Sequence, residues 1–414
     1  MRKLSVDPSK DLVAADVLLA LQLRNGNDPL LRRLETFECE DATESFAPLI
    51  PLFLSHRVTS IRIKFATNAP IVMVASTIAR LPILCPHIQS LILLGLPKHP
   101  VIIEAASEML LACDQNSLRV FAVYSPLTQE AHRVLYKLPN LQSLWASIQG
   151  PTPLPRLDLP SLVEVGLEYN DKHKWLQGFH GANLENLRCL SFHTSSGSIR
   201  IGDFLEGFRR VTLSSSIHNT LLAFAFRTRQ SWNPNYSSLL GFTQLTRLEI
   251  EFSCSTGCSS RVNDDIVIRI TQAMPNLETL QLGREPCNAA TGITLKGLVA
   301  LAYYCPKLTG LCIHLRAWEM AEAGNAPQAP DLYRYPTTTP KTSCSLTKIQ
   351  VGETPLREQD VFGVALTLIQ VFPRITVIEY TNGQWKKVAE MMTLIERVGS
   401  RVHWMSKLHL WHLS

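Results

Sequence analysis

Fourteen segments of this chain carry apolar residues at positions i, i+3 and i+5, the spacing of inward-facing side chains on one short strand. In six of them a proline stands two residues before position i. These six are CPHIQSL from Cys85, LPNLQSL from Leu138, LPSLVEV from Leu159, MPNLETL from Met274, CPKLTGL from Cys305 and FPRITVI from Phe372. The first positions of all fourteen lie 21 to 38 residues apart and are Leu34, Val58, Ile88, Leu118, Leu141, Leu162, Leu187, Leu221, Leu245, Leu277, Leu308, Leu346, Ile375 and Met405.

A strand that recurs at this interval is typical of a leucine-rich-repeat solenoid. The pattern therefore predicts an α/β horseshoe with a parallel sheet on its concave face and helices on its convex face. We expect residues 34–414 to form this repeat domain of about fourteen strands, with an insertion loop near residues 319–343. Residues 1–33 are expected to form a helical leader, in which the amphipathic segment Asp11–Leu23 caps the first repeat.

Helices are expected between the strands where the intervals are long. Asn263 is placed to cap a helix that opens with Asp264 and Asp265, whose negative charges suit the positive helix end. Thr354 and Pro355 predict the start of another helix. Each proline of the six segments is expected to end such a helix and turn the chain into the next strand.

The composition is that of a globular chain, with 46% apolar residues, 18% charged residues and a net charge of +5. The charge is spread without a long basic run, so nucleic acid is not expected as a partner. The most apolar stretch, residues 81–97, contains three prolines and is a poor candidate for a membrane span, so no membrane is expected either. Because charged residues interrupt the first part of the chain, no signal peptide is expected, and a cytoplasmic or nuclear location follows.

The cysteines and histidines that could bind a metal or take part in catalysis are scattered along the chain. Cys254 and Cys258 have no second pair of ligands at zinc-finger spacing, and His409 and His412 would point to opposite faces of the strand expected there. Five cysteines fall on a strand or just before one, where a thiol packs as a small hydrophobe: Cys39, Cys85, Cys189, Cys305 and Cys312. Phosphate-loop, nucleophile-elbow and metalloprotease motifs do not occur. We therefore expect no catalytic residue, no cofactor, no metal and no enzymatic activity.

A candidate binding surface follows from strand parity. If positions i, i+3 and i+5 face the core, positions i+2, i+4 and i+6 face the concave side. Most of these residues are polar, but three neighbouring repeats place large apolar side chains there, namely Ile92, Leu94, Tyr124 and Trp145. The sequence places basic residues on one flank and acidic residues on the other: Arg62 and Lys64, then Glu164 and Glu168. An aromatic pair among aliphatic side chains and opposite charges is typical of a protein-recognition hot spot.

Two alternatives to a binding surface remain. In the first, another part of the chain covers these side chains; in the second, the strand register is shifted by one residue and the side chains belong to the core. A weaker candidate lies in the longest interval, where Tyr333, Arg334 and Tyr335 stand in a proline-rich segment. That segment predicts a projecting loop that touches a partner, or an insertion without a role.

The proline-led repeats, with PLLRRLETFECED from Pro29 to Asp41, resemble the substrate-binding region of fungal F-box proteins with leucine-rich repeats, above all those of mushroom-forming fungi. The resemblance extends from Leu30 to Leu413. It implies a protein–protein interaction module that selects the substrate of a ubiquitin ligase on its concave face. In that family an F-box ahead of the repeats docks on the ligase adaptor. Here the repeat phase already runs at Leu34 and no Leu-Pro-x-Glu opening precedes it, so adaptor binding is expected only with an F-box upstream.

Two other functions remain open. A Ran-type GTPase activator, or another regulatory repeat protein, would need an arginine on a loop at a strand end, and Arg284 and Arg316 occupy such positions. A structural scaffold unconnected with a ligase is the third possibility. The last expected strand has no polar capping repeat behind it, so either Trp404 and Trp411 cover its edge or the chain is a fragment.

Overall fold

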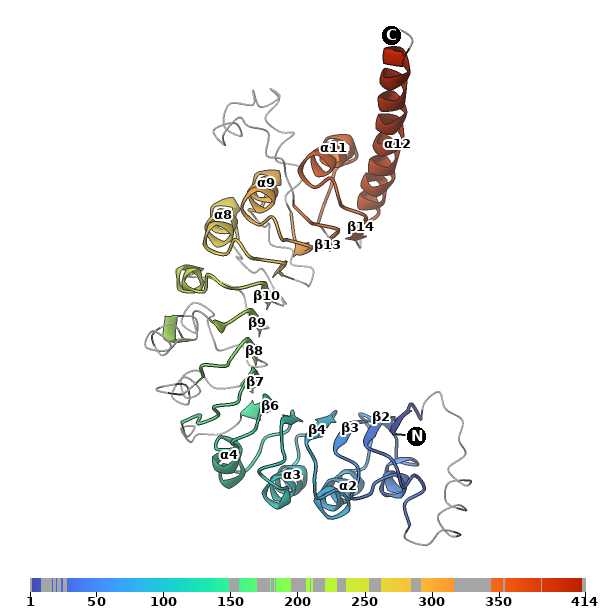
Figure 1. Ribbon diagram of the computed structural model, residues 1–414, viewed down its shortest axis with the longest axis vertical. Helices are drawn as coiled ribbons and strands as arrows, with labels where there is room; N and C mark the ends of the chain where they lie inside the picture. Colours follow the sequence, from blue (N-terminus) through green and yellow to red (C-terminus); the bar gives the residue numbers. More distant parts are fainter. Residues whose placement is uncertain are drawn as a thin grey trace. The chain divides into compact units, whose positions relative to one another are not determined.

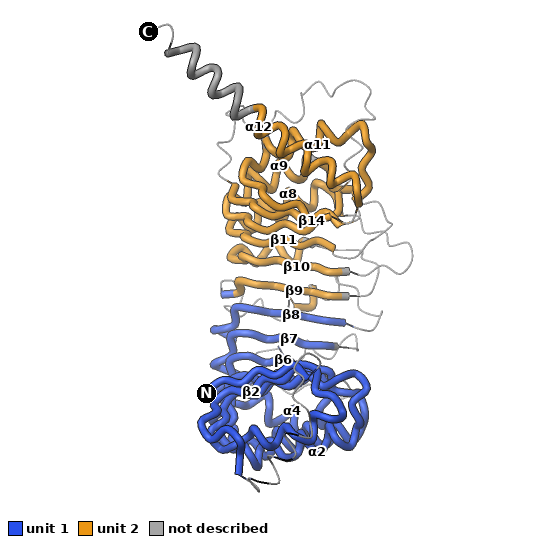
Figure 2. Tube along the Cα trace, turned by 90° about the vertical axis from the view of Figure 1, so that its right-hand side faces the viewer, with its two compact units in different colours: residues 1–198, 210–220 blue, residues 199–209, 221–414 orange. Residues whose placement is uncertain are grey.

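A computed structural model of the chain describes most of its residues, in two compact units (Figure 2). Unit 1 comprises residues 1–198 and 210–220, and unit 2 comprises residues 199–209 and 221–414. The described residues are 2–8, 17, 20, 24, 28–148, 156–169, 179, 182, 184–194, 206–208, 210, 220–228, 236–252, 262–283, 292–315, 344–352, 354–380 and 382–411.

The described residues of unit 1 form eight parallel strands that pair in sequence order. They are β1 (Lys3–Val6), β2 (Thr36–Ala42), β3 (Ser60–Phe65), β4 (Ser90–Leu94), β5 (Val120–Val123), β6 (Ser143–Ile148), β7 (Glu164–Tyr169) and β8 (Cys189–Thr194). Four helices lie on one side of this sheet (Figure 1): the 3-10 helix η1 (Ala47–Leu52), α2 (Ile71–Leu84), α3 (Pro100–Ala112) and α4 (Gln129–Leu135). These helices leave the other side uncovered, and we call it the open face of unit 1.

Unit 2 repeats this plan, with six parallel strands in the part that the structure describes. They are β9 (Ala223–Thr228), β10 (Arg247–Phe252), β11 (Thr279–Leu282), β12 (Gly310–Ile313), β13 (Lys348–Gly352) and β14 (Val377–Tyr380). The helices are η2 (Tyr236–Gly241), α8 (Asp264–Ala273), α9 (Leu295–Tyr304), η4 (Glu358–Asp360), α11 (Val361–Val371) and α12 (Gly383–Trp411). The predicted α/β class with a parallel sheet is therefore confirmed.

The core is made by the apolar residues at positions i, i+3 and i+5 of each repeat, and we call these three residues a triplet. From the triplet that starts at Leu34 to the one that ends at Val351, no triplet side chain is more than 3% exposed. Burial of one such aliphatic side chain contributes about 1.5–3 kcal/mol to folding, so this register is strongly favoured over a one-residue slip. The slipped register, one of the two alternatives to the binding surface, does not occur in unit 1.

After the first strand of each unit, every described strand begins with the same hydrogen-bond arrangement. The backbone carbonyl at position i+1 of one repeat accepts the N–H groups of positions i+1 and i+2 of the next repeat. For example, Thr246 O accepts Glu278 N at 2.7 Å and Thr279 N at 3.0 Å. The same pair of bonds recurs on carbonyls from Arg2 O in unit 1 to Thr347 O in unit 2. Within each unit, every described repeat after the first is thereby tied to the repeat before it by the same atoms.

The prolines act as the sequence predicted in four of the six segments. The helices α2, α8, α9 and α11 end one residue before a capping residue that is followed by proline. These capping residues share nearly one backbone conformation, with φ between −119° and −130° and ψ between 66° and 73°, and they are Cys85, Met274, Cys305 and Phe372. Proline disfavours helical backbone in the residue before it, which explains why the helix stops there and the chain turns into the strand.

The predicted last strand is wrong. The segment Met405–Leu410 belongs to α12, which runs on to Trp411. An i, i+3 pair lies on one face of a helix as well as on one side of this kind of strand, so the triplet at Met405 fits both structures. His409 therefore lies on a helix and not on the strand expected there, while His412 lies outside the described residues.

At the other end, part of the predicted helical leader is a strand. β1 pairs with β2 in register, Lys3 beside Thr36 and Val6 beside Cys39. The triplet pattern is present from Met1, with Leu4 and Val6 at i+3 and i+5, but no proline precedes it. Most of the predicted helix Asp11–Leu23 lies outside the described residues.

One helix starts later than predicted. Thr354 does not cap it, and α11 begins at Val361 after the 3-10 helix η4. The Thr354 hydroxyl instead accepts Leu315 N at 3.1 Å, while the Thr354 carbonyl accepts Trp385 Nε1 at 2.9 Å. In contrast, the predicted cap at Asn263 is confirmed, because its side chain accepts Ile266 N at 3.1 Å.

Candidate functional site

Four apolar side chains come together on the open face of unit 1, and we call them the aromatic patch. Ile92 and Leu94 lie on β4, Tyr124 directly follows β5, and Trp145 lies on β6. The strand register aligns Ile92 with Ala122 and Ala122 with Trp145. All four patch side chains are half-buried, whereas the residues that alternate with them along the strands form the core. The patch is therefore a surface feature built by three neighbouring strands.

The two aromatic rings of the patch touch. The ring centroids of Tyr124 and Trp145 are 6.3 Å apart and the ring planes are inclined by 50°. The Trp145 ring lies over Gly166 of β7, where an added Cβ would stand 2.0 Å from a ring carbon. Glycine is therefore required at position 166 for this ring position. The sequence reading missed this role of Gly166, although a glycine inside a strand pattern is a signal of close approach.

The basic flank lies on β3, which neighbours the patch strand β4. Arg62 aligns with Ile92 and Lys64 aligns with Leu94 in the strand register. Arg62 donates from Nε to Glu40 Oε1 at 3.0 Å, so part of its charge is balanced within unit 1. The Lys64 side chain is exposed.

The acidic flank lies on β7, and its two glutamates differ. Glu164 Oε2 accepts a hydrogen bond from Ser143 Oγ at 3.0 Å. Glu168 is only 8% exposed and forms an ion pair with Lys98, whose Nζ lies 3.0 Å from Glu168 Oε1. Glu168 is therefore held by a residue of unit 1 and does not present a free charge to a partner, contrary to the sequence-based expectation.

Lys98 reaches Glu168 because the chain turns sharply after β4. Gly95 has φ +71°, and a Cβ at this position would stand 2.3 Å from Phe65 O, so the turn needs glycine. The segment that follows carries Lys98 towards β7, although two strands, β5 and β6, separate β4 from β7 in the sheet. A Gly-Leu-Pro sequence signals a turn, but no local signal links residues that are 70 positions apart.

Among the described residues, the titratable groups with strongly perturbed pKa values lie in the core. Burial raises the pKa of the Cys39, Cys85 and Cys305 thiols to about 12. Burial also lowers the pKa of His132 to about 4, and its ring stacks on Tyr136 with centroids 5.6 Å apart. Thiols with so high a pKa stay protonated and are poor nucleophiles.

Two cysteines are placed differently from the sequence-based expectation. Cys189 and Cys312 occupy outward strand positions and are half-buried, whereas Cys39, Cys85 and Cys305 are buried as expected. Within the described ranges, no three His, Cys, Asp or Glu side chains are grouped so that they could hold a metal ion. Among the helices that the structure describes, none is both long and apolar enough to cross a membrane.

Several residues that the sequence singled out lie outside the described residues. They are Cys254, Cys258, Arg284, Arg316, the loop residues Tyr333, Arg334 and Tyr335, and His412. The insertion near residues 319–343 lies outside them as well.

Comparison with protein-family models gives no match to this chain, and comparison with curated proteins gives none either.

Proposed function

We propose that this protein is a protein-binding module whose ligand contacts the aromatic patch. The observation that carries the proposal is the Tyr124–Trp145 pair, half-buried on a sheet face that no described helix covers. Aromatic side chains in such positions supply much of the binding energy of protein interfaces when a partner removes them from water. Ile92 and Leu94 extend the apolar area, while Lys64 and Glu164 supply charges of opposite sign at its rim.

We further propose that the repeats form a leucine-rich-repeat horseshoe with the patch on its concave face. The recurring strand, the buried triplets and the proline-terminated helices support this assignment. By resemblance to fungal F-box proteins, the bound protein would be the substrate of a ubiquitin ligase in the cytoplasm or nucleus. Contact with the ligase adaptor would require an F-box.

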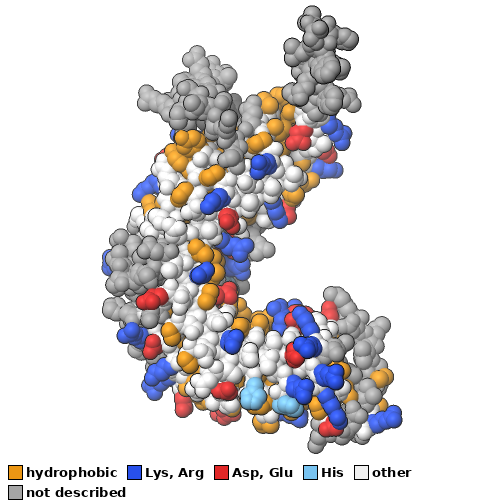
Figure 3. All heavy atoms as spheres, viewed as in Figure 1, with side chains coloured by type: hydrophobic (Ala, Val, Ile, Leu, Met, Phe, Trp, Pro, Cys, Tyr) orange, Lys and Arg blue, Asp and Glu red, His pale blue; other side chains and the backbone are white. Residues whose placement is uncertain are grey.

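The charge distribution supports a protein as the partner. In the view of Figure 3, Lys and Arg side chains are interspersed with Asp and Glu in both units. A nucleic-acid or anionic-membrane surface would favour an extended basic area instead.

The test is a comparison of two matched substitutions. Tyr124→Ala removes one ring of the patch, and Tyr303→Ala removes one ring of a second aromatic pair, formed with Tyr304 on α9 with centroids 4.9 Å apart. Proteins captured from cell extract by the wild-type chain and by both variants are quantified by mass spectrometry. The partner is the protein lost with Tyr124→Ala and retained with Tyr303→Ala.

Calorimetry with the purified partner then measures the contribution of Trp145. Trp145→Ala is expected to weaken binding by about 2 kcal/mol, or roughly thirtyfold, with little change in the melting temperature. If the captured proteins are the same for all variants, or if Trp145→Ala unfolds the chain while the folded fraction binds normally, the patch is not the binding site.

A further inference from the structure

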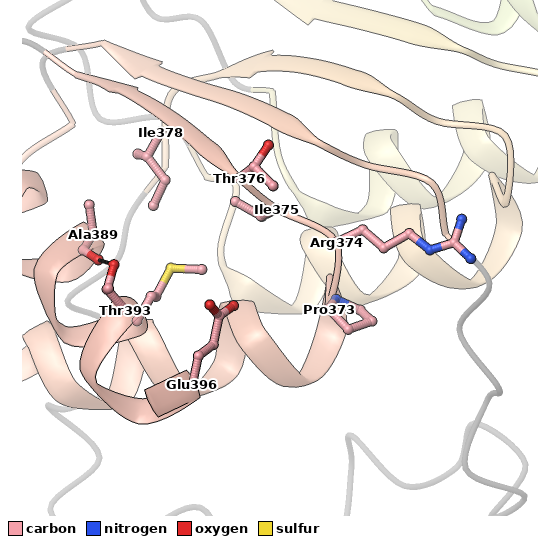
Figure 4. A pocket seen from close by; sticks show the side chains of 9 residues that line it. Pro373, Arg374, Ile375, Thr376, Ile378, Ala389, Thr393 and Glu396 are labelled. Carbon is pink, nitrogen blue, oxygen red and sulfur yellow. Dashed lines mark hydrogen bonds between the residues drawn. The ribbon is translucent and has the colours of Figure 1, made fainter. Parts of the chain in front are cut away.

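The end of unit 2 contains an open slot between the last strand and the helix that follows it. The slot has a volume of about 310 Å³ and is lined by the β14 segment and by α12. Figure 4 shows Ile375 and Ile378 from the strand segment, with Thr393 and Glu396 from the helix opposite them. Pro373, Arg374, Thr376, Ala389 and Met392 complete the lining.

Elsewhere in unit 2, side chains of the neighbouring repeat fill the equivalent space. In β10, β11, β12 and β13, the side chains at position i+3 are covered on both sides by neighbouring repeats, and none is more than 3% exposed. In β14 the corresponding residue, Ile378, is only half-buried, and the residue at i+5, Tyr380, is 37% exposed. The slot thus lies where the aliphatic side chains of a further strand would pack.

The backbone of β14 is open in the same way. In each earlier repeat of unit 2, the carbonyl at position i+1 receives two N–H groups from the next repeat, as Thr347 O receives Thr376 N and Val377 N at 2.9 and 3.1 Å. Within the part of the chain that the structure describes, no such pair of donors reaches the equivalent oxygen, Thr376 O. An added parallel strand would supply them.

The outer wall of the slot is held firmly in place. Trp385, Val388 and Met392 of α12 are buried, and Trp385 is anchored by its bond to the Thr354 carbonyl. Beyond these residues, Leu394 and Val398 are 55% and 51% exposed. Neither of these two residues lines the slot.

The rim of the slot carries one charge of each sign. Arg374 precedes the triplet of β14 at position i−1, and Glu396 lies on α12. Neither forms an ion pair with another described residue. In the repeat pair of β11 and β12, the residues at i−1 bond to each other, Lys307 Nζ to Asn276 Oδ1 at 3.0 Å. By analogy, an acidic residue at i−1 of an added strand would meet Arg374.

We propose that this slot binds an extended segment of a partner protein, which adds to β14 as a further parallel strand. The segment carries aliphatic residues at its first, fourth and sixth positions, a threonine or serine at the second, and an acidic residue just ahead of the first. Threonine at the second position follows from Thr309, Thr347 and Thr376, whose hydroxyls each donate to the previous repeat's carbonyl at 3.0–3.3 Å. This site is separate from the aromatic patch and does not depend on it.

The probe is the fluorescein-labelled peptide PDLTTLQLG. It is the sequence of residues 275–283 with an acid in place of Asn276 and a threonine in place of Glu278. Fluorescence polarisation with the full chain measures its binding against a scrambled peptide. Ile378→Asp places a charge in the slot and is expected to weaken binding about tenfold or more. Val377→Asp, the matched control on the adjacent residue and opposite side of the strand, is expected to change binding less than about twofold.

A second variant, Thr393→Phe, tests the slot independently in case Ile378→Asp disturbs the fold. Thr393→Phe starts from an exposed residue and fills the slot from the helix side, so it should block the peptide while the melting temperature is kept. Trp145→Ala should leave peptide binding unchanged, which separates this site from the patch. The proposal is overturned if the scrambled peptide binds equally well, or if Thr393→Phe binds like the wild type. It is also overturned if sedimentation shows self-association through the slot that Ile378→Asp abolishes, because the occupant would then be a second copy.

Discussion

Asp264 joins two consecutive helices of unit 2, and its replacement by alanine is expected to lower the free energy of unfolding by about 3 kcal/mol. The first helical residue of α8 reaches the start of α9. Its Oδ1 accepts Thr294 N at 2.8 Å and Gly297 N at 3.0 Å, while Oδ2 accepts Thr294 Oγ1 at 2.7 Å. The carboxylate thus caps a helix of the next repeat as well as standing at the start of its own.

The size of the expected loss in the free energy of unfolding follows from these three hydrogen bonds. A hydrogen bond to a charged group contributes about 1.5–3 kcal/mol, but the three share one carboxylate and water reaches part of the site after substitution. The Thr294 hydroxyl also still accepts Lys296 N at 3.1 Å, so α9 keeps one cap. We therefore expect about 3 kcal/mol in total, below the simple sum.

Asp265→Ala is the matched control for this experiment. Asp265 is the neighbouring acid in the first turn of α8 and is exposed, so its removal costs about 0.5 kcal/mol through the helix dipole alone. Urea unfolding followed by circular dichroism, at unchanged m-value, gives both numbers. A difference of less than about 1 kcal/mol between the two variants would refute the assignment of Asp264 as the link between the helices.

Three further predictions concern single residues of the two units. Gly166→Ala should push the Trp145 ring from its position, because the new Cβ would stand 2.0 Å from a ring carbon; calorimetry should show weaker partner binding and a normal fold by circular dichroism. The folded chain lowers the pKa of His132 to about 4, so His132 binds its proton more weakly when folded than when unfolded. Its contribution to the free energy of unfolding is therefore complete above about pH 6.5 and falls by about 3 kcal/mol as the pH drops towards 4. Urea unfolding across this range should show that slope in the wild type, and a His132→Gln variant with the same slope would contradict the reasoning. Cys85 and Cys305, with thiol pKa values raised to about 12, should react with a disulfide reagent only after guanidinium is added, and fast reaction of the folded chain would disprove their burial.

The strand positions could be predicted from the sequence because one rule governs them all. The apolar residues of a triplet must face the core, so a residue such as Leu280 or Leu311 is fixed by its spacing, and in these two repeats a leading proline supports the assignment. The triplet at Met405 had the same spacing and no leading proline, as did seven triplets that form strands, so the pattern alone did not distinguish it from a helix. The strand β1 was not predicted, because its triplet begins at Met1 and no proline precedes it.

The geometry of the open face was predictable only in part. Parity alone places Ile92, Tyr124 and Trp145 on one face, because alternation is a local property of strands. The pairing of Lys98 with Glu168 depends on how a turn directs a long side chain across two strands. Such contacts between distant residues leave no periodic signal, so the charge expected to be free proved to be bound.

The shared hydrogen bonds at the strand starts make the repeats interchangeable parts. Since the joint between two repeats uses the same backbone atoms each time, removing residues 277–307 would bring Thr309 and Gly310 to the carbonyl of Thr246 that now receives Glu278 and Thr279. The new joint would match the old one, with Leu308 in the place of Leu277. A gene for this protein could therefore lengthen or shorten by whole repeats through recombination with the joint kept. The joint also tolerates changes of length between the strands, because it is the same across intervals from 21 to 38 residues.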